Sequence, residues 1–593
     1  MTKLELYLSV GSCKEVRWLD GQHLIYVQAG PSGKSIICQD VDSKEAKTLY
    51  TTPEQIWKLT SKEGTILFTS DDGGNENEQI WVFKGDKPVK MTDLPKVRHY
   101  VGGMGPGGKT VFFSLNERDP RSFDLACMDL ETGEKKVLKE NHDNYNTPCS
   151  VSPDGRYVLY NKLMGHSNSA LWMLDTVTCQ TVRRPDTAAV MAGKSPSWLP
   201  DSSGFYYVSD EDSDFFYVAF CDAKTGRYEK VLEFGWDAEF VSLSPDGKKL
   251  AMTVNENGYS VLKVWDIEKK EFIKAPELPR GVMSSPAWDP EGKRLAFTLM
   301  TGTLAQDVWV ADLEKGCAKQ LSCSFPEGLG PDDFVEPELH CFKSFDGLTV
   351  PYFLYVPKGM EAKDLPVMIS IHGGPEGQSR PGVGNKGLIY YYISQGIAIV
   401  EPNVRGSVGY GKAYSHLDDV EKRLDSVKDI EYLVKHLTEE GIADPKRLGV
   451  MGGSYGGFMT LSCAARYPEL WCCAVATVGM FNLVTFLENT SQYRRPHREQ
   501  EYGTLEHDRE TLFNVSPAAK VDGIRGPLFV IHGKNDPRVP VTETYQVVEY
   551  LKNKGVDVTM LVYDDEGHGL QKFHNKVDCY PKVLEFVKKH MGL

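Results

Sequence analysis

Short apolar stretches follow polar turns at a regular spacing through the first half of the chain. The turn Ser-Pro-Asp-Gly at residues 152–155 recurs at residues 244–247, and looser versions occupy residues 199–204 and 289–292. In such a turn proline presets φ, and glycine supplies the positive φ that closes a hairpin. An apolar or aromatic strand is predicted after each of these turns, at residues 157–160, 205–208, 250–253 and 295–298.

The period of these hairpins favours one architecture. Degenerate copies of the turn at residues 20–21, 63–64 and 107–108 bring the total to seven between residues 20 and 292. A period of about 45 residues accommodates four short strands, which is one blade of a propeller. The alternative is a two-sheet sandwich, whose strands need not recur at a constant period. We therefore predict that residues 1–325 form a seven-bladed β-propeller.

The pattern changes after residue 321. Residues 323–331 are rich in turn formers and predict a linker, and residues 345–355 predict an antiparallel hairpin that opens a second domain. Apolar strands then alternate with amphipathic helices. The strands are predicted at residues 366–371, 397–400, 448–451, 474–478, 528–531 and 558–562, and two of the helices at 425–440 and 455–466. Near-continuous apolar strands are typical of a parallel sheet covered on both faces.

Composition and charge narrow the classes of function. The formal net charge of −15 argues against a nucleic-acid binder, which needs a basic face. Thirteen cysteines without a metal-type Cys-x-x-Cys pair predict reduced thiols and a cytoplasmic location. No stretch approaches the roughly 20 apolar residues of a membrane span, so no membrane association is expected. Glu5 interrupts the first apolar run, which argues against a signal peptide, and residues 1–12 are expected to be strand or coil.

The strongest chemical motif is Gly-Gly-Ser-Tyr-Gly at residues 452–456. It matches G-x-S-x-G and stands between a predicted strand and a predicted helix, where a sharp turn lifts a serine hydroxyl above a sheet. We predict that Ser454 is a nucleophile and that residues 326–593 form an α/β-hydrolase domain. The rival Ser407 lacks the first glycine, and its segment is interpreted as a structural loop.

A serine nucleophile needs a base and an acid, and this fold supplies them in the order Ser, acid, His. Asp536 follows the strand at residues 528–531, and His568 follows the last strand. We predict that His568 moves the proton and that Asp536 holds its tautomer. The competing acids Asp564, Asp565 and Glu566 lie too near His568 in the sequence. The competing histidines, His372 and His532, are interpreted as structural residues at strand ends.

An oxyanion hole requires two N–H donors. One is predicted to be the backbone of Tyr455, next to the nucleophile. The other is expected from the loop His-Gly-Gly-Pro at residues 372–375, where Gly374 is preferred and Gly373 is the alternative.

Together these residues resemble the prolyl-oligopeptidase family, in its acylaminoacyl-peptidase and dipeptidyl-peptidase-like branch. The matching motifs are His-Gly-Gly-Pro at 372–375, Asn-Val-Arg-Gly-Ser-Val-Gly-Tyr-Gly at 403–411, Gly-Gly-Ser-Tyr-Gly-Gly at 452–457 and His-Gly-Lys-Asn-Asp-Pro-Arg-Val-Pro at 532–540. The resemblance covers essentially the whole chain. It implies a propeller that caps an α/β-hydrolase domain. It also implies a serine peptidase that cleaves short peptides near the N-terminus of the substrate.

The resemblance also bears on how a substrate is held. It implies that Arg538 anchors the substrate in the manner of acylaminoacyl-peptidases. The N-terminal helix of that branch is not expected here, because residues 1–12 are predicted to be strand or coil. A pair of glutamates such as dipeptidyl peptidases use to hold a free amine is not evident, and Glu211 is the candidate we name. The choice between a blocked and a free N-terminus stays open.

The leading hypothesis is a serine peptidase that cleaves short peptides through an acyl-enzyme on Ser454. The alternative is a carboxylesterase on small acyl or aryl esters with the same triad, so the expected substrate is a short peptide or a small ester. A third hypothesis, a propeller-based binding protein with a vestigial hydrolase, is disfavoured by the intact triad. No cofactor or metal is implied, no nucleic-acid or membrane partner is expected, and a homo-oligomer is left open.

Overall fold

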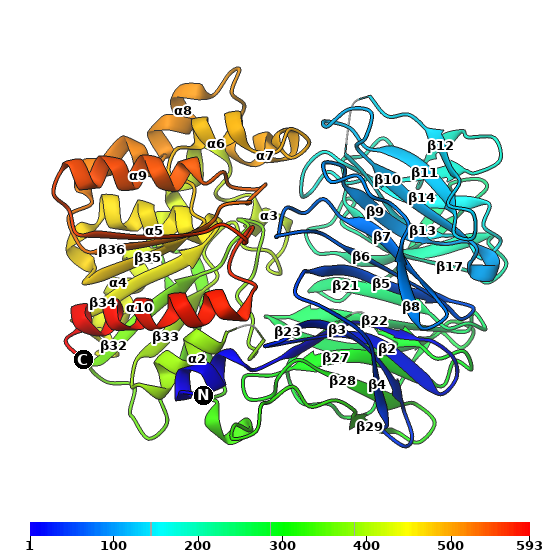
Figure 1. Cartoon of the computed structure of the whole chain (residues 1–593), viewed down its shortest axis with the longest axis horizontal. Helices are drawn as coiled ribbons and strands as arrows, with labels where there is room; N and C mark the ends of the chain where they lie inside the picture. Colours follow the sequence, from blue (N-terminus) through cyan, green and yellow to red (C-terminus); the bar gives the residue numbers. More distant parts are fainter. Residues whose placement is uncertain (143–144, 285, 385) are drawn as a thin grey trace.

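The computed structural model describes residues 1–142, 145–284, 286–384 and 386–593, and it has two lobes. A β-propeller forms one lobe and an α/β domain forms the other (Figure 1). The predicted fold class, an N-terminal seven-bladed β-propeller followed by a C-terminal α/β-hydrolase domain, is confirmed. Among the helices that the model describes, none is long and apolar enough to cross a bilayer.

Over the described residues, the propeller consists of seven antiparallel sheets, each made of consecutive strands. The first four blades are β1(Ser12–Trp18), β2(His23–Gly30), β3(Gly33–Asp40), β4(Ala46–Thr52); β5(Ile56–Lys62), β6(Thr65–Ser70), β7(Gln79–Lys84), β8(Lys87–Lys90); β9(His99–Met104), β10(Thr110–Leu115), β11(Asp124–Asp129), β12(Lys135–Lys139); and β13(Tyr145–Val151), β14(Tyr157–Leu163), β15(Leu171–Asp175), β16(Thr181–Arg183). The last three are β17(Gly193–Trp198), β18(Gly204–Ser209), β19(Tyr217–Asp222), β20(Tyr228–Leu232); β21(Asp237–Leu243), β22(Lys249–Glu256), β23(Tyr259–Asp266), β24(Glu271–Ile273); and β25(Val282–Met283), β26(Ala287–Trp288), β27(Arg294–Met300), β28(Asp307–Asp312), β29(Cys317–Gln320).

The repeated turn explains why the blades recur. In the turn at residues 152–155, the Gly155 N–H donates to the Ser152 carbonyl over 2.9 Å, and Gly155 has a φ of 74°. The turn at residues 244–247 repeats this arrangement, with 2.9 Å between Gly247 and Ser244 and a φ of 72°. Each turn therefore needs its glycine for the left-handed conformation that closes the hairpin.

The ring closes by packing between its first and last blades. The Cys13 N–H donates to the Gln306 carbonyl over 2.6 Å, and the Gly11 N–H donates to the Ser324 carbonyl over 2.8 Å. Apolar residues of both blades form one buried cluster: Cys13, Val16, Leu24, Tyr26, Ile37, Val41, Ala296, Val308, Val310 and Leu321. Because each blade is formed by consecutive strands, these contacts between the first and last blades hold the ring closed.

The catalytic lobe contains an eight-stranded sheet with the order β30-β31-β33-β32-β34-β35-β36-β37. Its strands are β30(Glu338–Lys343), β31(Thr349–Tyr355), β32(Leu365–Ile371), β33(Ala398–Pro402), β34(Ala443–Gly453), β35(Cys473–Thr477), β36(Leu528–Gly533) and β37(Val558–Tyr563). β30 and β31 are antiparallel, and the pairs from β33 to β37 are parallel. The opening hairpin begins at Glu338, before the predicted residues 345–355, which cover its turn and second strand.

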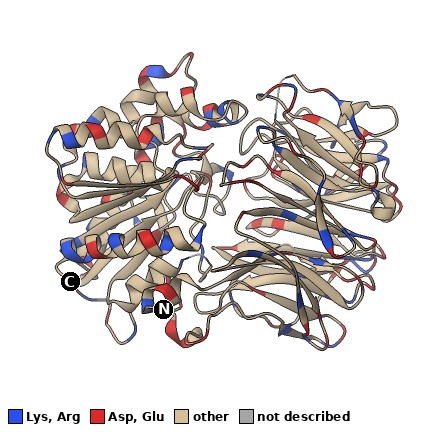
Figure 2. Ribbon diagram, in the orientation of Figure 1, with Lys and Arg blue, Asp and Glu red and all other residues tan. Residues whose placement is uncertain are grey.

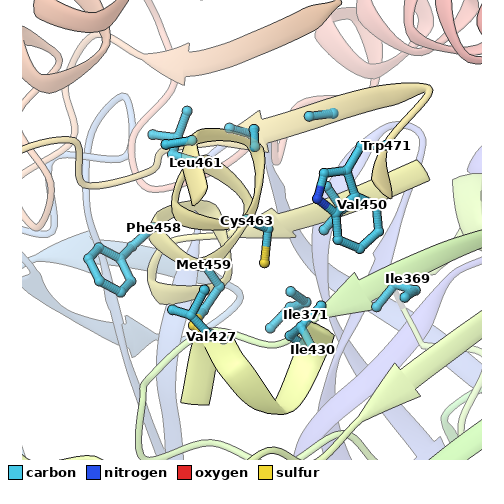
Figure 3. Close-up of a cluster of buried hydrophobic side chains, with 14 of the residues drawn as sticks. Ile369, Ile371, Val427, Ile430, Val450, Phe458, Met459, Leu461, Cys463 and Trp471 are labelled. Atoms are coloured by element: carbon cyan, nitrogen blue, oxygen red, sulfur yellow. The ribbon is translucent and has the colours of Figure 1, made fainter. Parts of the chain in front are cut away.

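Helices cover both faces of this sheet. The helices of the chain are α1(Lys3–Leu8), α2(Gly387–Ser394), α3(Lys412–Ser415), α4(Arg423–Glu439), α5(Tyr455–Arg466), α6(Leu483–Asn489), α7(Arg495–Tyr502), α8(Arg509–Val515), α9(Thr542–Asn553) and α10(Phe573–Met591), with short 3-10 turns η1(Pro106–Gly108), η2(Pro331–Asp333), η3(Val420–Lys422), η4(Pro468–Leu470) and η5(Pro517–Gly523). One face packs against α4, α5 and α9, and the other against α1, α2 and α10. Figure 3 shows the first of these clusters, with Ile369, Ile371, Val427, Ile430, Val450, Phe458, Met459, Leu461, Cys463 and Trp471.

The expectation that residues 1–12 are strand or coil is wrong, because Lys3–Leu8 form the helix α1. A capping box starts the helix: the Glu5 N–H donates to Thr2 Oγ1 over 3.2 Å, and the Thr2 N–H donates to Glu5 Oε2 over 2.7 Å. Leu4, Tyr7 and Leu8 are buried against α2 and α10 of the catalytic lobe. The sequence signal for this helix is Thr-x-x-Glu, in which Glu5 is a capping residue as well as a break in the apolar run.

Candidate active site

Ser454 stands at the sharp turn between β34 and α5. Its backbone has φ 58° and ψ −117°, a conformation that a residue with a side chain rarely adopts. The flanking glycines make the turn sterically feasible, because a Cβ on Gly456 would clash with the Ile371 carbonyl and one on Gly452 with the Gly456 carbonyl. The Ser454 N–H donates to the Thr477 carbonyl over 2.9 Å and so ties the turn to β35.

Asp536 and His568 meet above the carboxyl ends of β36 and β37. His568 Nδ1 lies 2.7 Å from Asp536 Oδ2, so its N–H donates to the carboxylate and leaves Nε2 as the basic nitrogen. The other oxygen of Asp536 accepts from the backbone N–H groups of Arg538 at 2.8 Å and Val539 at 3.0 Å. The carboxylate is thus held at both oxygens.

Electrostatics keep Asp536 ionised. Burial alone would raise its pKa, but the neighbouring His568 and His532 and their hydrogen bonds hold the pKa of Asp536 well below its usual range. A group that stays anionic is suited to stabilise an imidazolium on His568.

The rival residues have structural partners of their own. His532 is fully buried, lies 2.7 Å from Thr544 Oγ1 through Nδ1, and donates from Nε2 to the Val539 carbonyl over 2.9 Å. His372 Nε2 lies 2.8 Å from Ser407 Oγ, and that hydroxyl donates to the Val404 carbonyl over 2.6 Å. Burial lowers the pKa of His372.

The two glycines considered for the oxyanion hole occupy one loop beside the nucleophile. A Cβ on Gly373 would lie 3.3 Å from Ser454 Cβ, so Gly373 packs directly against the serine. Gly374 has a φ of 139°, and a Cβ there would lie 2.5 Å from the Glu376 nitrogen. Tyr455 begins α5, and its hydroxyl donates to Asp418 Oδ2 over 2.8 Å. The loop and the helix start therefore flank Ser454 from two sides.

Comparison with known proteins indicates the class of enzyme to which the chain is similar. The model of the prolyl oligopeptidase family matches residues 386–593. Over its catalytic lobe the chain is therefore similar to the prolyl oligopeptidase family. It is therefore a serine peptidase, as predicted, and the comparisons support that interpretation over an esterase.

Two curated relatives and one solved structure show the range of similarity. Dipeptidyl aminopeptidase BIII of Pseudoxanthomonas mexicana is 26% identical over 86% of this chain and 76% of its own length. The acylamino-acid-releasing enzyme of Arabidopsis thaliana is 29% identical over 38% of this chain and 30% of its own length. A puromycin-hydrolyzing peptidase of Mycobacterium tuberculosis, at 18% identity, shares the fold with a TM-score of 0.87 over 100% of this chain and 96% of its own.

Arg538 of the peptidase contacts the propeller. Its Nε donates to Oε1 of Glu76, whose side chain is buried, while the Arg538 side chain stays one-third exposed. Arg98 Nη1 donates to the other oxygen of Glu76 over 2.6 Å, and Arg98 also pairs with Glu78 at 3.0 Å. Sequence reasoning missed Glu76 and Arg98, because nothing in a blade repeat marks a residue that faces another domain.

A second buried ion pair supports the glycine loop. Arg498 pairs with Glu376 at 3.2 Å and donates to the Gly374 carbonyl over 3.2 Å. Burial would raise the pKa of Glu376, but Arg498 outweighs it and lowers that pKa to about 2. Burial and Arg498 together lower the pKa of His497 to about 3, so this imidazole is neutral at pH 7.

Two other candidate groups have partners away from the triad. Glu211 accepts from Thr187 Oγ1 over 2.6 Å and from the Tyr228 hydroxyl over 2.9 Å, both within the propeller. In the described chain, the carboxylates of Asp418, Asp419 and Glu501 come close enough to resemble a metal site. Arg423, however, donates to Asp418 and, over 2.6 Å, to Glu501. The guanidinium supplies the positive charge that a metal would bring.

A cleft separates the two lobes beside α7. Its volume is about 540 Å³. It is lined by the propeller residues Arg121, Ser122 and His142 and by the catalytic-lobe residues Glu488, Thr490, Gln492, Arg495, Pro496 and Glu499. Figure 2 shows residues of both charge signs on the loops where the lobes face each other. The cleft is therefore polar and lies between the domains.

Proposed function

We propose that Ser454 is the nucleophile of this peptidase, His568 its general base and Asp536 the acid that orients the base. The observation that carries the assignment is the 2.7 Å contact between His568 Nδ1 and Asp536 Oδ2. The strained turn at Ser454 supports it, because such a turn exposes a nucleophile at the end of a strand.

The reaction then follows from these positions. Ser454 Oγ attacks the scissile carbonyl while His568 Nε2 accepts its proton and passes it to the leaving amine. Water hydrolyses the resulting acyl-enzyme with His568 again acting as the base. We assign the backbone N–H groups of Tyr455 and Gly374 to the oxyanion, with Gly373 as the alternative to Gly374.

A fluorophosphonate probe tests the nucleophile. The probe should attach to the tryptic peptide that contains Ser454 and not to one that contains Ser407. Labelling of Ser407, or no labelling of a folded enzyme, would refute the assignment.

The proposed substrates are short peptides cut near their N-terminus. Support comes from the relatives, which are named as a dipeptidyl aminopeptidase and as an acylamino-acid-releasing enzyme. A peptide library with free and with acetylated N-termini decides between the two specificities. Release of dipeptides from free N-termini identifies the first, and release of single acylated residues identifies the second. Cleavage only at internal bonds would contradict both.

Access through the inter-domain cleft would restrict substrate size. A cleft of about 540 Å³ accommodates a short extended segment and excludes a folded domain. Peptides of up to a few tens of residues should be cut, while a native protein should survive and its unfolded form should be cleaved. Rapid internal cutting of the native protein would contradict this model.

We also propose that the peptidase works in the cytoplasm. The thirteen cysteines, none of which is in a disulfide, support a reducing compartment. Thiol titration of freshly purified enzyme should find all of them free, and cell fractionation tests the location directly.

A further inference from the structure

A single loop of the propeller contacts both loops that carry the proposed acid and base. It connects β6 to β7 in the second blade and comprises residues 71–78, and we call it the blade-2 loop. In Figure 1 the loops at one end of the propeller face the carboxyl ends of the catalytic strands.

Toward the acid, the blade-2 loop holds residues on either side of Asp536. Asn535 Nδ2 donates to the Gly73 carbonyl over 3.0 Å, and Arg538 pairs with Glu76. Because Asn535 precedes Asp536 and Arg538 follows it by two positions, both arms of the acid loop are attached to the propeller.

Toward the base, contact is made backbone to backbone. A Cβ on Gly74 would lie 2.6 Å from the Gly567 nitrogen, and a Cβ on Gly567 would clash with the Gly74 carbonyl. Gly567 immediately precedes His568. Beyond it, Glu54 accepts from the Gly73 N–H over 2.9 Å and pairs with Lys572 at 3.3 Å, which joins the same loop to the segment after His568.

The blade-2 loop is itself held rigidly. Glu76 has a φ of 60°, an uncommon conformation for a residue with a side chain, and its N–H donates to Asp71 Oδ2 over 2.9 Å. Its carboxylate lies between Arg98 and Arg538, with a side chain only 3% exposed. Both oxygens are therefore engaged by arginines, one from the propeller and one from the acid loop, so Glu76 links the two lobes.

We propose that the blade-2 loop acts as a clamp: it contacts the loops that carry Asp536 and His568 and so positions both residues. Glu76 is the positioning residue of this clamp. The inference rests on the triad proposed above. Removal of the Glu76 charge would leave Arg98 and Arg538 partly unpaired and release the acid loop. A displacement of about 1 Å in such a site can lower the rate about a hundredfold.

The decisive experiment compares E76Q with E239Q. Glu239 also makes an ion pair across the lobes, with Arg380 at 2.5 Å; this pair is partly buried, and neither residue belongs to the loop of Asp536 or the loop of His568. E76Q should lower fluorophosphonate labelling of Ser454 and kcat for a small ester about ten- to a hundredfold. KM should change little, and E239Q should stay within about twofold of wild type. Equal losses of labelling and kcat in E76Q and E239Q would mean that any ion pair between the lobes supports activity, which would overturn the clamp. Labelling of E76Q at the wild-type rate would overturn it as well.

The variant G74A keeps the proposal testable if E76Q folds poorly, and a double variant sharpens the test if E76Q folds. G74A would push the blade-2 loop away from Gly567 and should slow labelling in a protein whose far-UV spectrum and melting temperature match wild type. If Arg538 acts through Glu76, the double variant E76Q/R538A should be no slower on the small ester than the slower single variant. Additive losses, or an R538A defect confined to peptides, would contradict the clamp and favour direct substrate anchoring by Arg538. Absence of labelling in wild type would instead refute the triad itself.

Discussion

The propeller and the catalytic lobe differ in how far apart in sequence their contacting residues are. Each blade pairs consecutive strands, whereas the catalytic sheet places β33 between β31 and β32 and gathers the site residues from three separate strand ends. Local pairing produces a repeated, rigid scaffold, and non-local pairing produces convergence of distant loops. Chemistry therefore concentrates in the catalytic lobe, while the propeller contributes through the few loops that reach across.

The largest effect should come from the nucleophile and leave the propeller untouched. S454A should lower kcat for peptides by roughly six decades, because the triad acts as a unit. The melting temperature should remain unchanged, since one hydroxyl is lost at a turn. Peptidase assays and calorimetry check both points, and residual activity above a tenth of wild type would refute the role of Ser454.

A core substitution in a blade should show the opposite pattern. Leu295 is fully buried in β27, and L295A should cost about 2–5 kcal/mol of stability through a cavity. The exposed Val137 provides a matched control, because V137A should change stability by less than about 0.5 kcal/mol. Thermal unfolding measures both, while activity per folded molecule should stay near wild type. A large fall in kcat of fully folded L295A would contradict the view that the propeller core supports stability and not chemistry.

The Glu376–Arg498 pair should make the catalytic lobe sensitive to acid. The pKa of Glu376 falls from 4.5 to about 2 on folding, so the folded state favours the carboxylate. Its contribution to stability is present above pH 4.5 and is lost as the pH falls toward 2. E376Q should be less stable than wild type at pH 7 and should lose less stability between pH 4.5 and 2. Urea unfolding at several pH values measures the free energy of unfolding of both proteins. If the free energies of wild type and E376Q fell in parallel between pH 4.5 and 2, the prediction would be wrong.

The smallest effect is expected at the N-terminal cap. T2A removes the side-chain acceptor of α1 and should cost about 0.5–2 kcal/mol of local stability, whereas T2S retains a hydroxyl and should cost little. Hydrogen exchange should accelerate at residues 3–8 in T2A alone, with peptidase activity unchanged. Equal exchange in T2A and T2S would show that burial of Leu4 and Tyr7, not the cap, holds the helix.

The regular spacing of apolar stretches and the turn-forming residues between them allowed much of this structure to be predicted. The Ser-Pro-Asp-Gly turns located blades, and the bounds predicted for α5, residues 455–466, match the structure. Asp536 and His568 are predicted to be partners because each follows an apolar strand, and the structure places His568 Nδ1 2.7 Å from Asp536 Oδ2. The roles of Glu76 and Arg98 could not be predicted, since contacts across 462 residues of sequence leave no local pattern. The helix α1 was missed for another reason, because its capping signal was present but the apolar run around it was short.

The docking of α1 also has a consequence for the order of events during synthesis. The six residues of α1 precede the propeller in the sequence, yet the surfaces that bury them, α2 and α10, are formed by residues 387–394 and 573–591, which follow it. A helix this short is not stable alone in water, so α1 depends on its contacts with the catalytic lobe. During synthesis α1 can therefore dock only after α10 has been made, and until then Leu4, Tyr7 and Leu8 lack the surface that buries them.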